Sequence, residues 1–557
     1  MNTLYYGDNL DVLRRYFKAE SIDLVYLDPP FKSDQNYNVL FAEQSGARAA
    51  AQIKAFEDTW RWDQASAHAY QEVVEGGGRV SLAMQAFRTF LGENDLLAYL
   101  SMMAPRLVEL RRVLKASGSL YLHCDPSASH YLKQLLDAIF GPQNFRNEVT
   151  WKRTSAHGNP HRWGPVHDVL LFYTKGESYR WTPTTQGYEQ AYLASKYRQS
   201  DERGQYMSDN LTGAGLRQGD SGKPWRDFDP SALGRHWAVP ASLVLSIVGP
   251  DAGRMTTQEK LDLLDEQGYI LWPSAKKKGG ESFPRVKTYL GGGVPLQDVI
   301  TDIPPINSQA RERLGYPTQK PVALLERILR ASSSEGDTVL DPFCGCGTTV
   351  AAAQSLNRQW IGIDITHLAI TLIRHRLRDT YGDAVEKTYE VIGEPVSVPD
   401  AQALADEDKY QFQWWALGLV GARPAEQKKG ADKGIDGRLF FHDEPVGGQT
   451  KQIIISVKGG GISVKDLRDL RGVIDREKAA IGVLITMKEP TKPMRTEAAS
   501  AGFYHSDAWG KDYPRLQLLT IAELLGGKTI QYPPGEMLTF KKAPKAASQD
   551  QTADLFQ

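Results

Sequence analysis

A carboxylate, two prolines and an aromatic ring stand together at the end of an apolar run near the N-terminus. The run covers residues 22–27, and Asp28-Pro29-Pro30-Phe31 follows it directly. Ligands of open α/β sheets bind beyond the carboxyl ends of the strands, so this segment stands where chemistry is expected. The Asp28 carboxylate and the Pro29 carbonyl can accept two hydrogen bonds from one NH2 group, while the prolines hold the backbone rigid.

The chemistry that fits this segment concerns an amine that is a poor nucleophile. The lone pair of an exocyclic base amine is delocalised into the ring, so the nitrogen must rehybridise as it attacks a methyl group. Hydrogen bonds accepted from the NH2 group favour that change. Phe31 offers a face on which a flipped-out base can stack. A proline-terminated strand with a capping aspartate would show the same four residues, so the motif needs support from elsewhere in the chain.

A glycine-containing loop later in the chain is typical of nucleotide binding. The loop covers residues 341–349, with the sequence Asp-Pro-Phe-Cys-Gly-Cys-Gly-Thr-Thr, and it follows a predicted strand over 338–340. A helix is predicted over 350–356. Gly345 and Gly347 allow the backbone to approach a ligand closely.

An acidic residue, Asp364, ends the next predicted strand, at about the place where an acid binds ribose hydroxyls in dinucleotide folds. Cys344 and Cys346, in the loop before it, belong to only three cysteines in the chain. A structural zinc site needs a second pair of ligands. These two cysteines are therefore predicted to be small packing side chains.

The order of the two motifs resembles that of the beta class of DNA amino-methyltransferases, which place an Asp-Pro-Pro-aromatic acceptor motif before a glycine-loop cofactor motif. The resemblance covers roughly 1–375 and implies an α/β fold, a circularly permuted Rossmann-like sheet that binds S-adenosylmethionine. It also implies double-stranded DNA as a partner, with the target base flipped out. Family members with Asp-Pro-Pro usually act on adenine N6, whereas Ser-Pro-Pro is commoner for cytosine N4. Adenine is therefore expected, and cytosine stays open.

The resemblance also implies roles for individual residues. Asp8 would contact the cofactor adenine, and Asp364 would bind the ribose. The segment 316–321, Tyr-Pro-Thr-Gln-Lys-Pro, is similar to the family segment that helps to close the pocket. The predicted catalytic residues are Asp28, Pro29, Pro30 and Phe31; the predicted cofactor-binding residues are Asp8, Thr318, Gln319, Lys320, Asp341, Pro342, Phe343, Gly345, Gly347, Thr348 and Asp364.

A block over roughly 409–530 places an acid and a lysine on neighbouring predicted strands. Asp436 precedes one strand, and a second strand carries Ser456 and Lys458. Phosphodiester cleavage with Mg²⁺ needs an anionic cradle for the metal and a cation near the attacking water. This block resembles the Mrr-like restriction endonuclease domain, of the PD-(D/E)xK fold. The resemblance makes Asp436, Ser456 and Lys458 the candidate nuclease residues, with Asp436 as a Mg²⁺ ligand.

The nuclease pattern is incomplete in this chain. Ser456 stands where the fold usually carries Glu, Asp or Gln, and the predicted helix around 412–415 lacks the acid that family members often place there. Fewer carboxylates mean a weaker Mg²⁺ site, because hard cations prefer charged oxygen ligands. Asp432 is a candidate replacement ligand.

Two functions therefore stay open. One is a DNA methyltransferase fused to a Mg²⁺-dependent restriction endonuclease. The other is a DNA methyltransferase whose inactive nuclease-like domain binds DNA or a partner. A methyltransferase acting on an RNA or protein amine is disfavoured by Asp28 in place of Asn and by the nuclease-like neighbour.

The composition bounds the remaining possibilities. With 557 residues and a formal net charge of -1, the chain has room for several domains, and any DNA contact must come from local patches. No window is apolar enough to span a membrane, and no secretion signal is recognisable, so a cytoplasmic protein without a membrane partner is expected. A homodimer is compatible with the sequence. The candidates for DNA contact are aromatic and basic residues of the long central stretch: Trp225, Arg226, Arg235, His236, Trp237 and 276–278. Buried tryptophans and solvated lysines would explain these residues equally well.

These assignments predict the elements that must position the motifs. Short apolar runs alternate with helical patterns at both ends of the methyltransferase-like part. Between them lies a long Gly-, Pro-, Trp- and Arg-rich stretch. The predicted domains are a first methyltransferase part over 1–175, a target-recognition region over 176–310, a second methyltransferase part with the cofactor motif over 311–385, a linker over 386–408, the Mrr-like domain over 409–530 and a disordered tail over 531–557.

Overall fold

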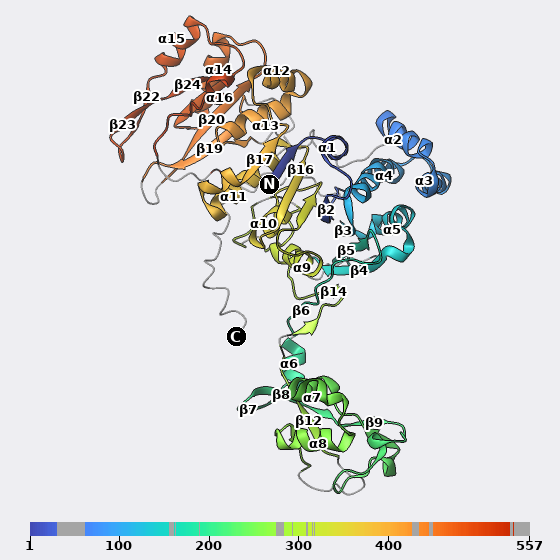
Figure 1. Cartoon of the computed structure of the whole chain (residues 1–557). Coiled ribbons are helices and arrows are strands. Elements are labelled where there is room, and N and C mark those ends of the chain that lie inside the picture. The colour runs from blue at the N-terminus through green and yellow to red at the C-terminus, as the bar shows by residue number, and fades with distance from the viewer. Residues whose placement is uncertain are drawn as a thin grey trace. The chain divides into compact units, whose positions relative to one another are not determined.

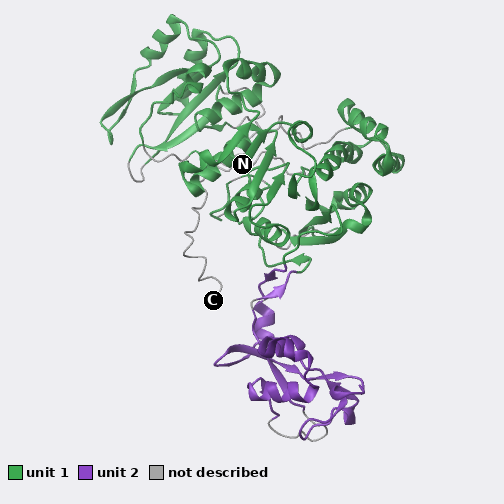
Figure 2. Ribbon diagram, in the orientation of Figure 1, with its two compact units in different colours: residues 1–182, 297–555, 557 green, residues 183–296, 556 purple. Residues whose placement is uncertain are grey.

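The structure is a computed structural model of the whole chain. It describes residues 1–30, 62–154, 161, 163–188, 190–273, 283–291, 293–307, 310–314, 316, 318–425, 434–444, 449–534 and 539. The contacts divide the chain into two compact units (Figure 2): residues 1–182 together with those from 297 onward, and residues 183–296.

A nine-stranded mixed sheet forms the centre of the first unit. The strand order is β14-β4-β5-β3-β2-β15-β16-β1-β17. Only β5 runs antiparallel to its neighbours β3 and β4, and the other pairs are parallel. The strands are β1 Asn2–Tyr6, β2 Ile22–Leu27, β3 Leu114–Cys124, β4 Phe145–Lys152, β5 His167–Thr174, β14 Val299–Ile300, β15 Thr338–Asp341, β16 Gln359–Asp364 and β17 Tyr389–Ile392.

Helices cover both faces of this sheet (Figure 1). On β2, Val25 and Leu27 point into one hydrophobic cluster, and Leu24 and Tyr26 point into another. This alternation follows from the two-residue period of a strand. The first cluster contains residues of α1 Asn9–Tyr16, α2 Gln64–Glu75, α3 Gly78–Leu91, α4 Asp95–Val113 and α5 Pro126–Phe140; the second contains residues of α9 Val322–Ser332, α10 Thr348–Ser355 and α11 His367–Tyr381.

The segment 386–408, which we expected to be a linker, is largely structured. It contains β17, the edge strand that pairs with β1, and α12 Val398–Glu407. Pro399 lies in the first turn of α12, where a backbone N–H is not needed for the helix. Ser397 and Asp400 form the capping box of this helix.

The second unit, residues 183–296, has its own small core. Trp225 and Trp237 are 3% and 2% exposed and pack in this core, so they are not available for the DNA contact considered for them. Arg226 pairs with Asp265, and the candidate lysines 276–278 lie outside the described residues. The elements are β6 Thr185–Gln186, α6 Gln190–Lys196, β7 Gln199–Asp201, β8 Gly204–Asn210, β9 Thr212–Ala214, β10 Arg235–Trp237, α7 Ala241–Val248, α8 Thr257–Glu266, β11 Ile270–Leu271, β12 Arg285–Tyr289 and β13 Val294–Pro295.

The C-terminal block forms a five-stranded sheet with the order β18-β19-β20-β21-β24. Strands β19 and β20 are adjacent, as the sequence predicted for the strands near Asp436 and Lys458, and they run antiparallel. The elements are α13 Lys409–Leu419, β18 Arg423–Pro424, β19 Gly437–His442, β20 Thr450–Lys458, α14 Val464–Arg476, β21 Ile481–Thr486, α15 Lys492–Ser500, β22 Phe503–Ser506, β23 Lys511–Pro514, β24 Leu516–Thr520 and α16 Ile521–Leu525. Most of the predicted tail lies outside the described residues.

Candidate active site

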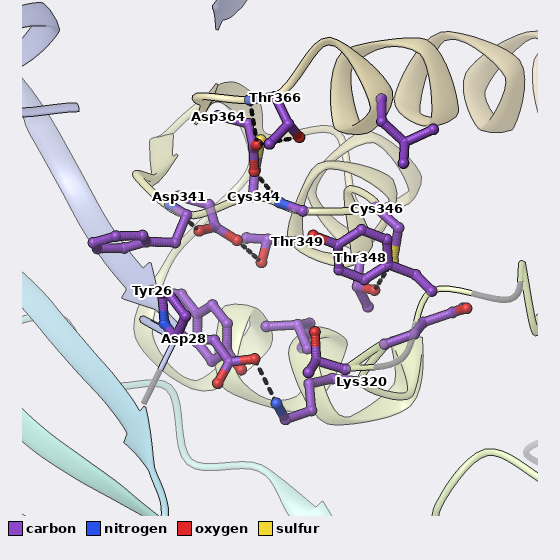
Figure 3. A pocket seen from close by; sticks show the side chains of 18 of the residues that line it. Tyr26, Asp28, Lys320, Asp341, Cys344, Cys346, Thr348, Thr349, Asp364 and Thr366 are labelled. Atoms are coloured by element: carbon purple, nitrogen blue, oxygen red, sulfur yellow. Dashed lines mark hydrogen bonds and ion pairs between the residues drawn. The ribbon is translucent and has the colours of Figure 1, made fainter. Parts of the chain in front are cut away.

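The acceptor segment and the glycine loop come together because their strands are neighbours. Strands β2 and β15 are parallel, with Leu24 opposite Val339 and Val25 opposite Leu340. Asp28 and Asp341 therefore leave the sheet at the same edge. One pocket is lined by residues of both segments (Figure 3). The lining residues are Tyr26, Asp28, Pro30, Tyr316, Thr318, Gln319, Lys320, Leu325, Asp341, Phe343, Cys344, Gly345, Cys346, Thr348, Thr349, Asp364, Thr366, Leu368 and Trp414.

The Asp28 carboxylate is not isolated in this pocket. The Lys320 ammonium forms an ion pair with its Oδ2 atom (Figure 3). The Lys320 side chain is 14% exposed and the Asp28 side chain 24% exposed. Water can therefore screen this pair only partly, and the acceptor segment is tied electrostatically to the segment before α9.

Asp341 is a buried acid at the start of the glycine loop. Its two oxygens accept hydrogen bonds from Thr349 Oγ1 at 2.5 Å and from the Phe343 amide at 3.0 Å. Burial nevertheless raises the pKa of Asp341 to about 7, since the charged form loses the solvation of water.

Asp364 is the second buried acid of the pocket. It accepts hydrogen bonds from the Gly345 amide at 2.9 Å and from the amide and hydroxyl of Thr366 at 2.9 and 2.8 Å. Burial raises the pKa of Asp364 to about 6. Two acids that are costly to ionise favour a ligand that brings positive charge or hydrogen-bond donors.

The glycine loop depends on conformations that favour glycine. Gly345 and Gly347 have φ values of 49° and 71°. A Cβ on Gly347 would lie 2.7 Å from Ile373 Cγ1, and one on Gly345 would lie 3.1 Å from the Tyr316 ring. Side chains at either position would disturb the turn that leads into α10. The neighbouring Cys344 and Cys346 are buried and free, as predicted for packing side chains.

Some predicted site residues are not among those that line the pocket. These are Asp8, Pro29, Pro342 and Gly347. The Asp8 carboxylate caps α1 through the Leu10 amide and pairs with Arg106 at 2.6 Å. Phe31 lies outside the described residues.

Sequence reasoning missed a buried network behind the acceptor segment. The Tyr26 hydroxyl is 2.8 Å from His123 Nδ1, and His123 Nε2 is 3.1 Å from Asp168 Oδ2. Arg153 Nε lies 3.2 Å from the other oxygen of Asp168. The alternation of residues along β2 indicates that Tyr26 faces inward. Its partners could not be predicted from the sequence, because they come from strands that are distant along the chain. Trp414, which also lines the pocket, was assigned in the sequence to the nuclease-like block.

Two of the three candidate nuclease residues, Asp436 and Ser456, are hydrogen-bonded to each other, and Lys458 lies two residues further along the same strand as Ser456. Asp436 accepts hydrogen bonds from Gln413 Nε2 at 3.2 Å, from Ser456 Oγ at 3.0 Å and from the Val457 amide at 2.7 Å. Among the residues that the structure describes, no group of three His, Cys, Asp or Glu side chains could hold a metal ion. Asp432 lies outside them. The expected Mg²⁺ ligand Asp436 is thus engaged in holding α13 and β20 together, and the expected Mg²⁺ site has no support.

Comparison with known proteins gives two family matches, one to each end of the chain. A model described as DNA methylase matches residues 22–374, and one described as NACHT-associated inactive Restriction Endonuclease 1 matches residues 409–526. The second match agrees with a restriction-endonuclease relationship but does not single out the Mrr-like group.

Several characterised proteins are similar to this chain. Type II methyltransferase M.EcaI of Enterobacter cloacae is 29% identical over 391 residues, which are 69% of this chain and 72% of that protein. The Mod subunit of the Type III restriction-modification enzyme StyLTI of Salmonella typhimurium is 26% identical over 64% of this chain, which spans only 50% of that subunit. DNA adenine methyltransferase YhdJ of Escherichia coli is 46% identical over 78 residues, 14% of this chain and 26% of that protein.

No helix in the described part of the chain is long and apolar enough to cross a bilayer.

The match over residues 22–374 spans well over half of the sequence and includes both the acceptor segment and the glycine loop. On this evidence the chain belongs to the DNA methylase family.

Proposed function

We propose that this protein transfers a methyl group from S-adenosylmethionine to an exocyclic amine of a DNA base. The observation that carries the proposal is the single pocket lined by Asp28 from the acceptor segment and by Asp341 and Asp364 around the glycine loop. Two buried acids beside a glycine loop suit a ligand that carries a sulfonium, an ammonium and ribose hydroxyls. Asp341, Phe343, Gly345, Thr348 and Asp364 would hold it.

The acceptor side of the pocket supplies hydrogen-bond acceptors for the amine. When bound, the cofactor supplies an electrophilic methyl group. Lys320 already pairs with Asp28 Oδ2, so Oδ1 is the atom proposed to accept a hydrogen bond from the NH2 group, with the Pro29 carbonyl as the second acceptor. These acceptors orient the nitrogen lone pair and stabilise the positive charge that develops on it. Phe31 is proposed to stack on the flipped base.

Adenine N6 is the proposed target atom. The acceptor motif carries Asp at position 28, and one relative is named as an adenine methyltransferase. Two of the relatives are named as restriction-modification proteins or Type II methyltransferases, which supports a role in protecting DNA from restriction. Double-stranded DNA with a flipped base is the proposed substrate.

The arrangement of the chain supports two further assignments. The acceptor strand β2 precedes the cofactor strand β15 in the chain, yet the two are adjacent in the sheet, as a circularly permuted methyltransferase would have them. Residues 176–310, most of which form a separate compact unit, are proposed to recognise the target sequence.

The C-terminal domain is proposed to keep a PD-(D/E)xK-like fold, related to Mrr-like domains, without cutting DNA. Asp436 is engaged by Gln413, Ser456 and Val457, and the matching family is described as inactive. The proposed role of this domain is therefore to bind DNA or a partner and not to cleave DNA.

The decisive experiment is single-molecule sequencing of DNA from a methylation-free host that expresses the protein. We expect N6-methyladenine in one sequence context, and its loss in Asp28→Ala. Methylated cytosine would overturn the assignment to adenine. Unmodified DNA, together with no binding of S-adenosylmethionine by the purified protein, would overturn the proposed function.

A further inference from the structure

One residue in the lining of the cofactor pocket belongs to the C-terminal domain. Trp414 lies on α13, the first helix of the block that matches the inactive endonuclease family. It is 6% exposed and lines the same pocket as Asp341 and Asp364. An indole ring offers a large, rigid contact area, so Trp414 contributes a wall to this pocket.

Helix α13 belongs to two hydrophobic clusters at once. Phe412, Trp415, Ala416 and Leu417 pack in the core of the C-terminal sheet. Trp414 packs in a separate cluster with Leu314, Cys346, Leu368 and Leu372 of the methylase part. Helix α13 therefore joins the methylase part of the first unit to the C-terminal domain.

The methylase-facing side of α13 makes a regular set of contacts with α11. Gln411, Trp414 and Gly418 are spaced by three and four residues and thus lie on one side of the helix. Gln411 Oε1 accepts a hydrogen bond from the His367 amide at 3.3 Å. Gly418 lies so close to α11 that an added Cβ would be 2.7 Å from Thr371 Oγ1.

The degenerate nuclease centre helps to place this helix. Gln413, the residue before Trp414, donates a hydrogen bond to Asp436 at 3.2 Å. Asp436 in turn accepts hydrogen bonds from Ser456 and Val457 on β20. These hydrogen bonds fix α13 to the sheet, and with it the position of Trp414.

We propose that Trp414 is a cofactor-binding residue supplied by the C-terminal domain, so that this domain is part of the S-adenosylmethionine site. The inference rests on the proposed function, because it takes the pocket to be the cofactor site. This role in cofactor binding does not require the nuclease-like domain to cleave DNA.

The test measures cofactor binding by the full chain in Trp414→Ala, Trp414→Phe and a matched control. Trp509→Ala is suitable as the control, because Trp509 lies in the same domain, is 40% exposed and does not line the pocket. Isothermal titration with S-adenosylmethionine should give a Kd at least tenfold higher for Trp414→Ala, an intermediate Kd for Trp414→Phe and an unchanged Kd for Trp509→Ala. The KM for the cofactor should rise, while kcat at saturating cofactor stays within about twofold, a split that unfolding would not produce.

The outcomes separate the two proposals. If the wild-type protein binds the cofactor and Trp414→Ala binds it equally well, the inference fails and the proposed function stands. If the wild-type protein does not bind it, both fail. Thermal unfolding without ligand checks each variant; should Trp414→Ala not fold, Trp414→Leu keeps the apolar contact with Leu368, and an unchanged Kd in that variant would overturn the inference.

Discussion

Lys320 and Asp28 form an ion pair across 292 residues of sequence. The pair joins the segment before α9 to the acceptor segment after β2, and neither side chain is more than about a quarter exposed. It holds the carboxylate in place before any substrate arrives. The charge of Lys320 also offsets part of the cost of a third acid in a pocket that already contains Asp341 and Asp364.

Asp28→Ala should reduce methyl transfer strongly without weakening cofactor binding. The substitution removes the carboxylate acceptor altogether, and loss of one preorganised hydrogen-bonding group typically costs about 10²–10³-fold in kcat. The measurement is incorporation of labelled methyl groups into DNA, with the cofactor Kd measured in parallel. Asp11→Asn, at an exposed position on α1, should behave as wild type. A kcat within threefold of wild type in Asp28→Ala would exclude the acceptor role of Asp28.

Cofactor affinity should rise with pH between about 5 and 8. Burial raises the pKa of Asp364 to about 6 and that of Asp341 to about 7, so a cationic ligand that favours their charged forms must displace protons in this range. Titration calorimetry at pH 6.5 in buffers of different ionisation enthalpy should show proton release. Asp364→Asn should reduce that release, and a pH-independent Kd would contradict the assignment of these acids.

The ligand-free protein should lose stability over the same range. A buried acid with a raised pKa holds its proton in the folded state when the unfolded chain has already released it. The folded state then binds more protons, and the free energy of unfolding falls as pH rises from about 4 to about 7. The free energy of unfolding of Asp364→Asn minus that of wild type should therefore be larger at pH 8 than at pH 5. Denaturation at both pH values measures the difference, and the opposite order would contradict it.

Gly347→Ala should destabilise the methylase part. The residue has a φ of 71°, and the new Cβ would approach Ile373 Cγ1 to 2.7 Å. A strained backbone of this kind typically costs about 1–3 kcal/mol. Gly472→Ala provides the contrast, because Gly472 is an exposed position inside α14 with open space around its Cα, and alanine there should stabilise by up to about 1 kcal/mol. Thermal unfolding of both variants checks the pair.

Asp436→Ala should destabilise the C-terminal domain rather than abolish a cleavage activity. The substitution leaves the Ser456 hydroxyl, the Val457 amide and the Gln413 amide group without their acceptor. Unsatisfied buried groups cost about 1–3 kcal/mol each. Wild-type protein should leave unmodified plasmid DNA intact with Mg²⁺ or Mn²⁺. Cleavage that disappears in Asp436→Ala would show that the domain is an active nuclease.

The acceptor segment and the glycine loop could be located from the sequence, because both follow apolar strands and the carboxyl ends of parallel strands meet at one edge. The adjacent strands near Asp436 and Lys458 were predictable from two apolar runs separated by a short polar stretch. Partners that come from distant elements were not predictable. Tyr26 meets His123 and Asp168 only once β2, β3 and β5 are aligned, and no local pattern encodes that alignment.

The errors have physical causes too. The linker predicted over 386–408 contains a helix with Pro399 in its first turn, a part of a helix that accepts proline. Two explanations were open for Trp225 and Trp237, DNA contact and burial, and the structure shows them buried in a small core. Trp414 was placed correctly on a helix of the C-terminal block, but its pattern could not show that the helix has a second apolar side facing another domain.

Helix α13 also decides where this polypeptide can be divided. An expression fragment that stops near residue 385 would leave Leu368, Leu372 and Cys346 exposed to water, while a fragment that begins near residue 420 would remove Phe412 and Trp415 from the other core. Any exchange of one part for another would have to keep this helix, because its two sides fill two different cores.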